Sequence, residues 1–145
     1  MIQRIQSLFL LLASVCFWVL FKLPFATSSA VASPIFEDKV FNINDNTILL
    51  VLAILGGVLT LANIFLFNNR PLQMRLNYLN VIFALFLGTV AFWLVFSNGQ
   101  EIGNAVEISD GMGLYFPIGA LIFVILSNVF IKKDNKLVKS MDRLR

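Results

Sequence analysis

The chain has 145 residues, of which 59% are hydrophobic and 13% charged, and its formal net charge is +3. Soluble domains carry about 25% charged residues, so this composition and the mean hydropathy of +0.86 exclude an ordinary soluble domain. The sequence has no histidine, and its one cysteine, Cys16, has no partner for an intrachain disulfide. The basic residues lie between and after apolar segments, so a nucleic-acid partner is not expected.

Four apolar segments are each long enough to cross a bilayer, which takes about 20 residues. They cover approximately residues 5–25, 47–67, 76–96 and 114–131. The last three contain no charge, while Lys22 interrupts the first shortly before Pro24 marks its exit. Apolar residues occupy every face of these segments, which excludes a soluble bundle with a polar exterior. The sequence therefore predicts one all-α membrane domain over residues 1–145, with four transmembrane helices in an antiparallel bundle.

Local signals support these boundaries. Asn44, Asp45 and Asn46 offer N-caps just before the second segment, and Pro71 suits the first turn of the third. Only residues 68–75 separate the second and third segments, a connection short enough to make the two helices an antiparallel hairpin.

Lys and Arg are distributed very unevenly between the two sides of such a bundle. One side carries Arg4, Arg70, Arg75, Lys132, Lys133, Lys136, Lys139, Arg143 and Arg145, and the other carries only Lys22 and Lys39. Basic residues near span ends favour the cytoplasmic side, so both termini are expected in the cytoplasm.

A competing interpretation treats the first segment as a signal peptide, because Arg4 precedes an apolar core and residues 30–32 resemble a small-residue cleavage site. Against it, Lys22 and Pro24 separate the core from that site by more than usual.

The two loops on the side poor in basic residues, 23–46 and 97–113, are expected to be simple solvated connectors. The alternative is a small exterior cap that both loops form together, and Gly103-Asn104 gives a weak hairpin signal. On the other side, residues 132–145 place Leu137, Val138 and Leu144 at helical spacing among basic residues. This pattern predicts a basic amphipathic tail that binds anionic lipid or, alternatively, docks to a cytoplasmic partner.

No ionisable side chain lies deep within the segments, which weighs against a proton-coupled transporter, an ion pump or an intramembrane protease. The polar residues instead gather near the cytoplasmic ends of the segments. They are Gln6, Asn63, Asn77, Asn80 and Asn128. Carboxamides can hydrogen-bond across helices, so this layer is expected to stabilise the bundle, with a headgroup or partner site as the alternative. No metal or cofactor site is expected.

Small residues recur four apart at Ala53 and Gly57, at Gly56 and Thr60, and at Ala84 and Gly88. Such pairs allow close helix packing. They predict either a tight hairpin of the second and third helices or a contact with another subunit.

Three stretches, MIQRIQSLFLLLA at the start, FNNRPLQMRLNYLN in the centre and IKKDNKLVKSMDRLR at the end, carry a family resemblance. With these basic blocks in this order, the chain resembles an uncharacterised four-span family of Bacteroidetes inner-membrane proteins that is known only as a domain of unknown function. The resemblance covers essentially the whole chain and implies a bacterial source and a multi-pass inner-membrane location. It supplies no catalytic or binding residues.

The leading functional hypothesis is a non-enzymatic accessory or scaffolding subunit of an inner-membrane complex. Its partners would be other membrane proteins and anionic lipids. The expected contacts are Arg70, Arg75, Lys132, Lys133, Lys136, Lys139, Arg143 and Arg145. The alternative is a small-solute or lipid transporter that acts as a homo-oligomer with the amide layer lining its path. A lipid-modifying enzyme is disfavoured because candidate nucleophiles and bases are lacking.

Overall fold

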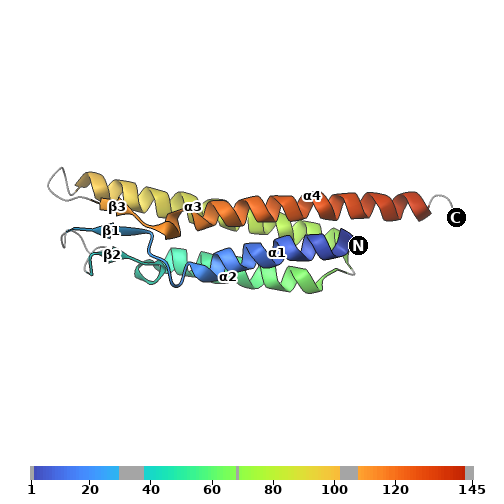
Figure 1. Ribbon diagram of the computed structural model, residues 1–145, viewed down its shortest axis with the longest axis horizontal. Helices are drawn as coiled ribbons and strands as arrows, with labels where there is room; N and C mark the ends of the chain where they lie inside the picture. The colour runs from blue at the N-terminus through green and yellow to red at the C-terminus, as the bar shows by residue number, and fades with distance from the viewer. Residues whose placement is uncertain (1, 30–37, 68, 102–107, 143–145) are drawn as a thin grey trace.

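The computed structural model describes residues 2–29, 38–67, 69–101 and 108–142, which form a four-helix bundle with a small sheet at one end (Figure 1). The helices are α1 (Ile2–Val19), α2 (Thr47–Phe65), α3 (Arg70–Glu101) and α4 (Phe116–Asp142). The short elements are β1 (Ala26–Ser28), β2 (Val40–Phe41), β3 (Ile108–Asp110) and the 3-10 helices η2 (Ile43–Asp45) and η4 (Met112–Leu114).

Each helix packs against its two neighbours in the ring α1-α2-α3-α4, and α4 closes the ring against α1. The chain reverses direction at every connection, so α1 begins and α4 finishes at the same end of the bundle (Figure 1). We call this end the termini end and the opposite one, where the strands lie, the sheet end.

Three helices in the described part of the chain are long and apolar enough to cross a membrane. They lie within Thr47–Phe65, Arg70–Ser97 and Met112–Val138. The apolar part of α1, Ile5–Val19, is shorter. The helix expected over residues 5–25 ends at Val19. Pro24 cannot continue a helix, and the next residue, Phe25, is already in an extended pairing, since its N–H donates to the Phe41 carbonyl at 2.8 Å.

The second helix begins at Thr47, as predicted, whereas α3 and α4 extend well beyond the expected spans. With 32 residues α3 is about 48 Å long, and with 27 residues α4 is about 40 Å, against about 30 Å for a hydrocarbon core. The expected separate tail over 132–145 is continuous with α4 as far as Asp142. In Figure 1 the last turns of α4 project beyond the start of α1 at the termini end.

Both loops at the sheet end contribute to one three-stranded antiparallel sheet, in the order β2-β1-β3. Ala26 pairs with Phe41 on one side and with Asp110 on the other. The chain is mainly helical, as predicted, but the two loops are not simple connectors. Their backbone groups satisfy one another by pairing, which fits the alternative of a small cap that both loops form together. Residues Gly103 and Asn104, which carry the hairpin signal, lie outside the described residues.

The small residues make close contacts between helices other than the expected hairpin partners. A Cβ on Gly56 would lie 2.6 Å from Phe17 Cε1, and one on Gly57 would lie 3.1 Å from the Trp18 indole, so both glycines face α1. Gly88 faces Pro117 of α4 at 3.3 Å. The three glycines among these small residues thus face α1 or α4, while α2 and α3 also pack against each other.

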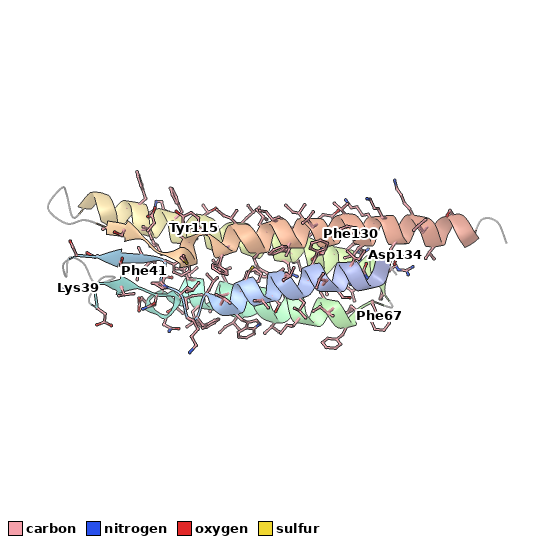
Figure 2. The ribbon with its side chains drawn as sticks, in the orientation of Figure 1. Lys39, Phe41, Phe67, Tyr115, Phe130 and Asp134 are labelled. Atoms are coloured by element: carbon pink, nitrogen blue, oxygen red, sulfur yellow. The ribbon has the colours of Figure 1, made fainter. Side chains whose placement is uncertain are left out.

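The half of the bundle nearest the sheet has an apolar interior, which includes Phe17, Leu49, Leu87 and Ala120. Apolar side chains also cover much of the outside, and Figure 2 shows Phe67 pointing away from the turn between α2 and α3. An apolar exterior of this extent suits a lipid environment.

Candidate functional site

The interior of the bundle is polar at the termini end. The buried face of α3 follows a spacing of three and four residues from Gln73 to Val95: Gln73, Asn77, Asn80, Ala84, Leu87, Ala91 and Val95. Its first three members are carboxamides and its last four are apolar. The other helices add buried polar side chains at the same end: Gln6 from α1, Thr60 and Asn63 from α2, and Ser127 and Asn128 from α4.

Asn77 joins three helices within this layer. Its amide nitrogen donates to the Ser127 hydroxyl at 2.7 Å and to the Val124 carbonyl at 3.1 Å, both on α4. Its amide oxygen accepts from Asn63 Nδ2 of α2 at 3.4 Å. Gln73 adds a second link, because its amide donates to the Asn63 carbonyl at 3.1 Å. The layer therefore connects α2, α3 and α4 through side chains.

Several polar atoms of the amides in this layer have no hydrogen-bond partner within the described part of the chain. They are both polar atoms of Gln6, both of Asn80, and the side-chain oxygens of Asn63, Gln73 and Asn128. A buried amide without a partner costs roughly 1–3 kcal/mol, so these groups are places where water or a ligand atom would be favoured.

All five amides named from the sequence are buried in this end of the bundle, and the structure brings Asn63 and Asn77 into contact. Sequence reasoning missed Gln73 and Ser127. The spacing from Asn77 and Asn80 back to Gln73 follows the same helical face, so that signal was present for Gln73. Ser127 carries no such signal, since isolated serines are common in spans.

The structure separates the predicted basic residues into groups. Arg70 Nη2 pairs with Asp134 Oδ2 at 3.0 Å and links the start of α3 to α4. Lys133 Nζ lies 5.6 Å from the centre of the Phe130 ring. Arg75, Lys132 and Lys136 instead line one pocket. The side chains of Lys139, Arg143 and Arg145 lie outside the described residues.

That pocket, which we call the basic pocket, lies between α3 and α4 at the termini end and has a volume of about 500 Å³. Its wall is formed by Pro71, Met74, Arg75, Tyr78, Lys132, Asn135 and Lys136. Lys132 Nζ lies over the Tyr78 ring, 5.6 Å from its centre.

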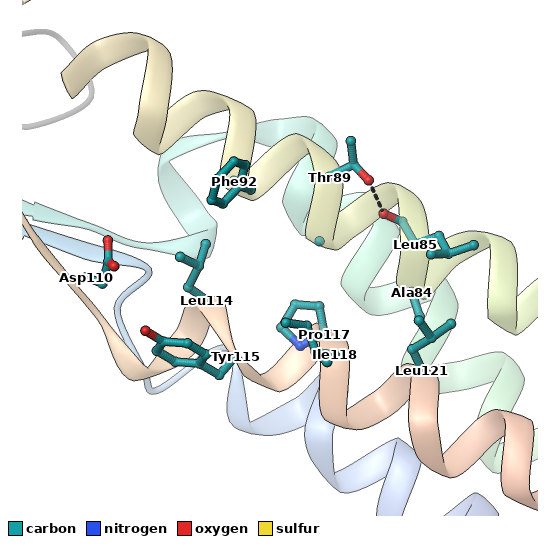
Figure 3. A pocket seen from close by; sticks show the side chains of 11 residues that line it. Ala84, Leu85, Thr89, Phe92, Asp110, Leu114, Tyr115, Pro117, Ile118 and Leu121 are labelled. Carbon is teal, nitrogen blue, oxygen red and sulfur yellow. Dashed lines mark hydrogen bonds between the residues drawn. The ribbon is translucent and has the colours of Figure 1, made fainter. Parts of the chain in front are cut away.

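A second pocket, the lateral groove, lies between the same two helices toward the sheet end and has a volume of about 440 Å³ (Figure 3). Its lining is mainly apolar and includes Ala84 and Gly88 on α3 and Pro117, Ile118 and Leu121 on α4. Asp110 and Tyr115 are labelled at the end next to β3, and the Thr89 hydroxyl donates to the Leu85 carbonyl of its own helix at 2.8 Å.

A family model described as "Domain of unknown function (DUF4293)" matches residues 2–144. The chain belongs to this family. No curated protein and no solved structure matches the chain. The description assigns no residue a role, so the chemistry of the pockets is argued from their own side chains.

Within the residues described, no three or more His, Cys, Asp or Glu side chains come together as a metal site. The polar atoms of the interior belong to amides and hydroxyls, which exchange hydrogen bonds and do not titrate near neutral pH. The described residues instead form two sites at which another molecule could bind, an apolar groove and a basic pocket, both between α3 and α4.

Proposed function

We propose that this member of the DUF4293 family is a non-enzymatic accessory or scaffolding subunit of a bacterial inner-membrane protein complex. In this proposal α1 is a fourth span, both termini are cytoplasmic, and the source is a member of the Bacteroidetes. The asymmetry of Lys and Arg supports the orientation, since seven of the nine basic residues that the structure describes lie at the termini end and only Lys22 and Lys39 lie at the sheet end. The partners are other membrane proteins and anionic lipids of the cytoplasmic leaflet.

The observation that carries the proposal is the lateral groove. It opens on the outer surface of α3 and α4 among exposed apolar side chains, including Leu85, Phe92 and Ile118. Ala84, which is buried, and Gly88, which faces Pro117 of α4, carry little or no side chain, so the groove between the two helices is not filled from α3. A groove of this kind on a lipid-facing surface suits a transmembrane helix of a partner protein.

Polar groups in the groove distinguish a partner helix from a lipid chain as its occupant. The Asp110 carboxylate and the Tyr115 ring lie at the sheet end of the groove. The N-terminal turn of a helix has unpaired N–H groups and a partial positive charge, so a partner helix that begins beside Asp110 gains hydrogen bonds there. A hydrocarbon chain gains nothing from a carboxylate.

The test uses a photoreactive p-benzoylphenylalanine at Leu85 or Ile118 in the full chain, expressed in its native membrane. We expect a discrete adduct with one other membrane protein, identified by mass spectrometry. Thr89→Trp, which fills the groove from an exposed position, should remove both this adduct and the co-purification of the same protein. Matched controls place the photoreactive residue or the Trp at Val58, which is exposed on α2.

Each other outcome counts against the proposal. Equal adducts from Val58 would show nonspecific collision in the membrane. Adducts with lipid alone would make the groove a lipid site. An adduct with a second copy of this chain would favour the homo-oligomeric transporter instead.

That transporter is the second candidate, and the unpartnered amides of Gln6 and Asn80 favour it. A transport path would hydrate them. In a Cys16→Ala background, Asn80→Cys should react rapidly with a small hydrophilic methanethiosulfonate if a path exists. Leu87→Cys, on the same buried face but in the apolar half, is the matched unreactive control. Absence of reaction at position 80 would remove this candidate.

A further inference from the structure

The basic pocket is separated from the other basic residues of the termini end by their contacts. Arg70 is engaged by Asp134, and Lys133 lies over Phe130, whose ring stacks on Phe9 of α1 at 5.4 Å between centres. Arg75, Lys132 and Lys136 are exposed and line one cavity, which Lys133 does not line. Lys132 also lies over an aromatic ring, but this ring is Tyr78 of the same cavity wall. These three cations are therefore available to a shared ligand.

Helical spacing brings them together. Pro71, Met74, Arg75 and Tyr78 follow one face of α3, and Lys132, Asn135 and Lys136 follow one face of α4, with steps of three or four residues. Among the described side chains, the lining includes no acidic one that would neutralise the three cations. Like charges held around one cavity repel one another, and an anion placed among them relieves that repulsion.

The lining as a whole suits a phosphate group that carries acyl chains. Arg75 offers a planar fork of donors suited to a phosphate, and Lys132 and Lys136 add point charges. Tyr78 and Met74 provide apolar walls, and on the same helix Leu79 and Ile82 are exposed farther toward the middle of the bundle. An acyl chain leaving the pocket would therefore meet apolar surface.

We propose that the basic pocket binds the phosphate headgroup of an anionic phospholipid. Arg75, Lys132 and Lys136 contact the phosphate, Asn135 donates to the remaining headgroup oxygens, and the acyl chains run along α3 toward Ile82. This site rests on the proposed membrane location but not on the proposed partner protein. A free phosphate ion could form the same contacts with the three cations. The exposed apolar surface beside the pocket favours a phospholipid, because only a phospholipid has acyl chains to place there.

The experiment titrates the purified full chain in a neutral detergent with dioctanoylphosphatidylglycerol and measures binding by native mass spectrometry. Parallel titrations use dioctanoylphosphatidylcholine and inorganic phosphate. We expect saturable binding of phosphatidylglycerol and much weaker binding of the other two. The triple variant Arg75→Gln, Lys132→Gln, Lys136→Gln should bind phosphatidylglycerol about 100-fold more weakly, since each basic residue near an anionic surface contributes roughly a factor of five.

The control removes the same number of charges elsewhere. Lys22→Gln, Lys39→Gln, Lys133→Gln has the same net charge as the test variant and leaves the pocket lining intact. It should bind phosphatidylglycerol within about twofold of the unmodified chain. An equal loss in both variants would overturn the proposal, because binding would then follow total charge alone. Inorganic phosphate binding as tightly as the lipid would also overturn it, in favour of a soluble anion.

A second variant keeps the proposal testable if the glutamine variant fails to fold. Lys132→Arg, Lys136→Arg preserves the charges and should retain phosphatidylglycerol binding, whereas Lys132→Glu alone should weaken it strongly. Failure of this site would leave the photo-crosslinking at Leu85 and Ile118 unchanged. Loss of those adducts would in turn leave lipid binding unchanged, so the two proposals fail separately.

Discussion

Asn77 links α2, α3 and α4 through three hydrogen bonds in the interior of the bundle. Asn77→Ala would remove these bonds and leave the Asn63 amide nitrogen and the Val124 carbonyl with fewer partners. We expect the free energy of unfolding to fall by about 1–2 kcal/mol, near the upper range for polar contacts between membrane helices. Reversible unfolding of the purified chain in mixed micelles with increasing SDS measures the change.

The control for this substitution is Asn44→Ala in η2, where the side chain is exposed. It should change the free energy of unfolding by less than about 0.5 kcal/mol. Equal effects at positions 44 and 77 would show that the buried amide bonds add nothing beyond what any asparagine contributes.

Arg70 and Asp134 form an ion pair at 3.0 Å, with their side chains 21% and 14% exposed. The pair joins the start of α3 to α4 outside the apolar part of the bundle. A double-mutant cycle with Arg70→Gln, Asp134→Asn and both together should give a coupling energy of about 0.5–2 kcal/mol, because the pair is only partly solvated. A coupling energy near zero would mean that the pair is as weak as an ordinary surface contact.

Among the connecting elements, Gly111 gives the turn between β3 and α4 its close approach to Pro24. A Cβ at position 111 would overlap the Pro24 carbonyl oxygen, and one at Gly113 would lie 2.7 Å from the same atom. Gly111→Ala should therefore disrupt the pairing of β1 with β3 and cost about 1–3 kcal/mol. The amide N–H of position 111 donates to the Phe25 carbonyl at 2.8 Å in the unmodified chain, and its hydrogen exchange should become faster in the variant.

Gly119→Ala is the matched control for this substitution. A Cβ there would lie 3.6 Å from Cys16 Sγ, an ordinary contact distance, and alanine favours the helical backbone more than glycine does. The free energy of unfolding should stay constant or rise slightly. A Gly111→Ala protein as stable as Gly119→Ala would show that the turn can move away from Pro24 at little cost.

The helices were predictable because their signals are local. Asn46 is confirmed as the N-cap of α2, since its Oδ1 accepts from the Ile48 N–H at 2.9 Å and the Leu49 N–H at 3.4 Å. Pro71 lies in the first turn of α3, as expected. The strands were not predictable, because they are two or three residues long and exist only where Ala26 meets Phe41 and Asp110.

At the scale of the whole molecule, the sheet requires the loop after α1 and the loop after α3 to share one side of the membrane. In a Cys16→Ala background, Asp38→Cys and Met112→Cys should both react with a membrane-impermeant maleimide added outside intact cells. Asn69→Cys and Ser140→Cys should react only after the membrane is opened. Opposite behaviour of positions 38 and 112 would contradict the crossing and return of the chain through α2 and α3, and reaction of position 140 from outside would reverse the proposed orientation.

The sequence by itself predicted a mainly helical chain with four apolar segments and with amides at one end of the bundle; in the described part of the chain, three of these segments form helices long and apolar enough to cross a membrane. These properties follow from composition, helical periodicity and caps, which act over a few neighbouring residues. Only the tertiary structure decided that Phe17 and Trp18 pack on two glycines of α2 and that two loops form a sheet. It also decided that Arg75, Lys132 and Lys136 share a pocket, whereas Arg70 pairs with an acidic residue. Those outcomes depend on the rotation and register of helices against one another, which side-chain packing selects and no local pattern encodes.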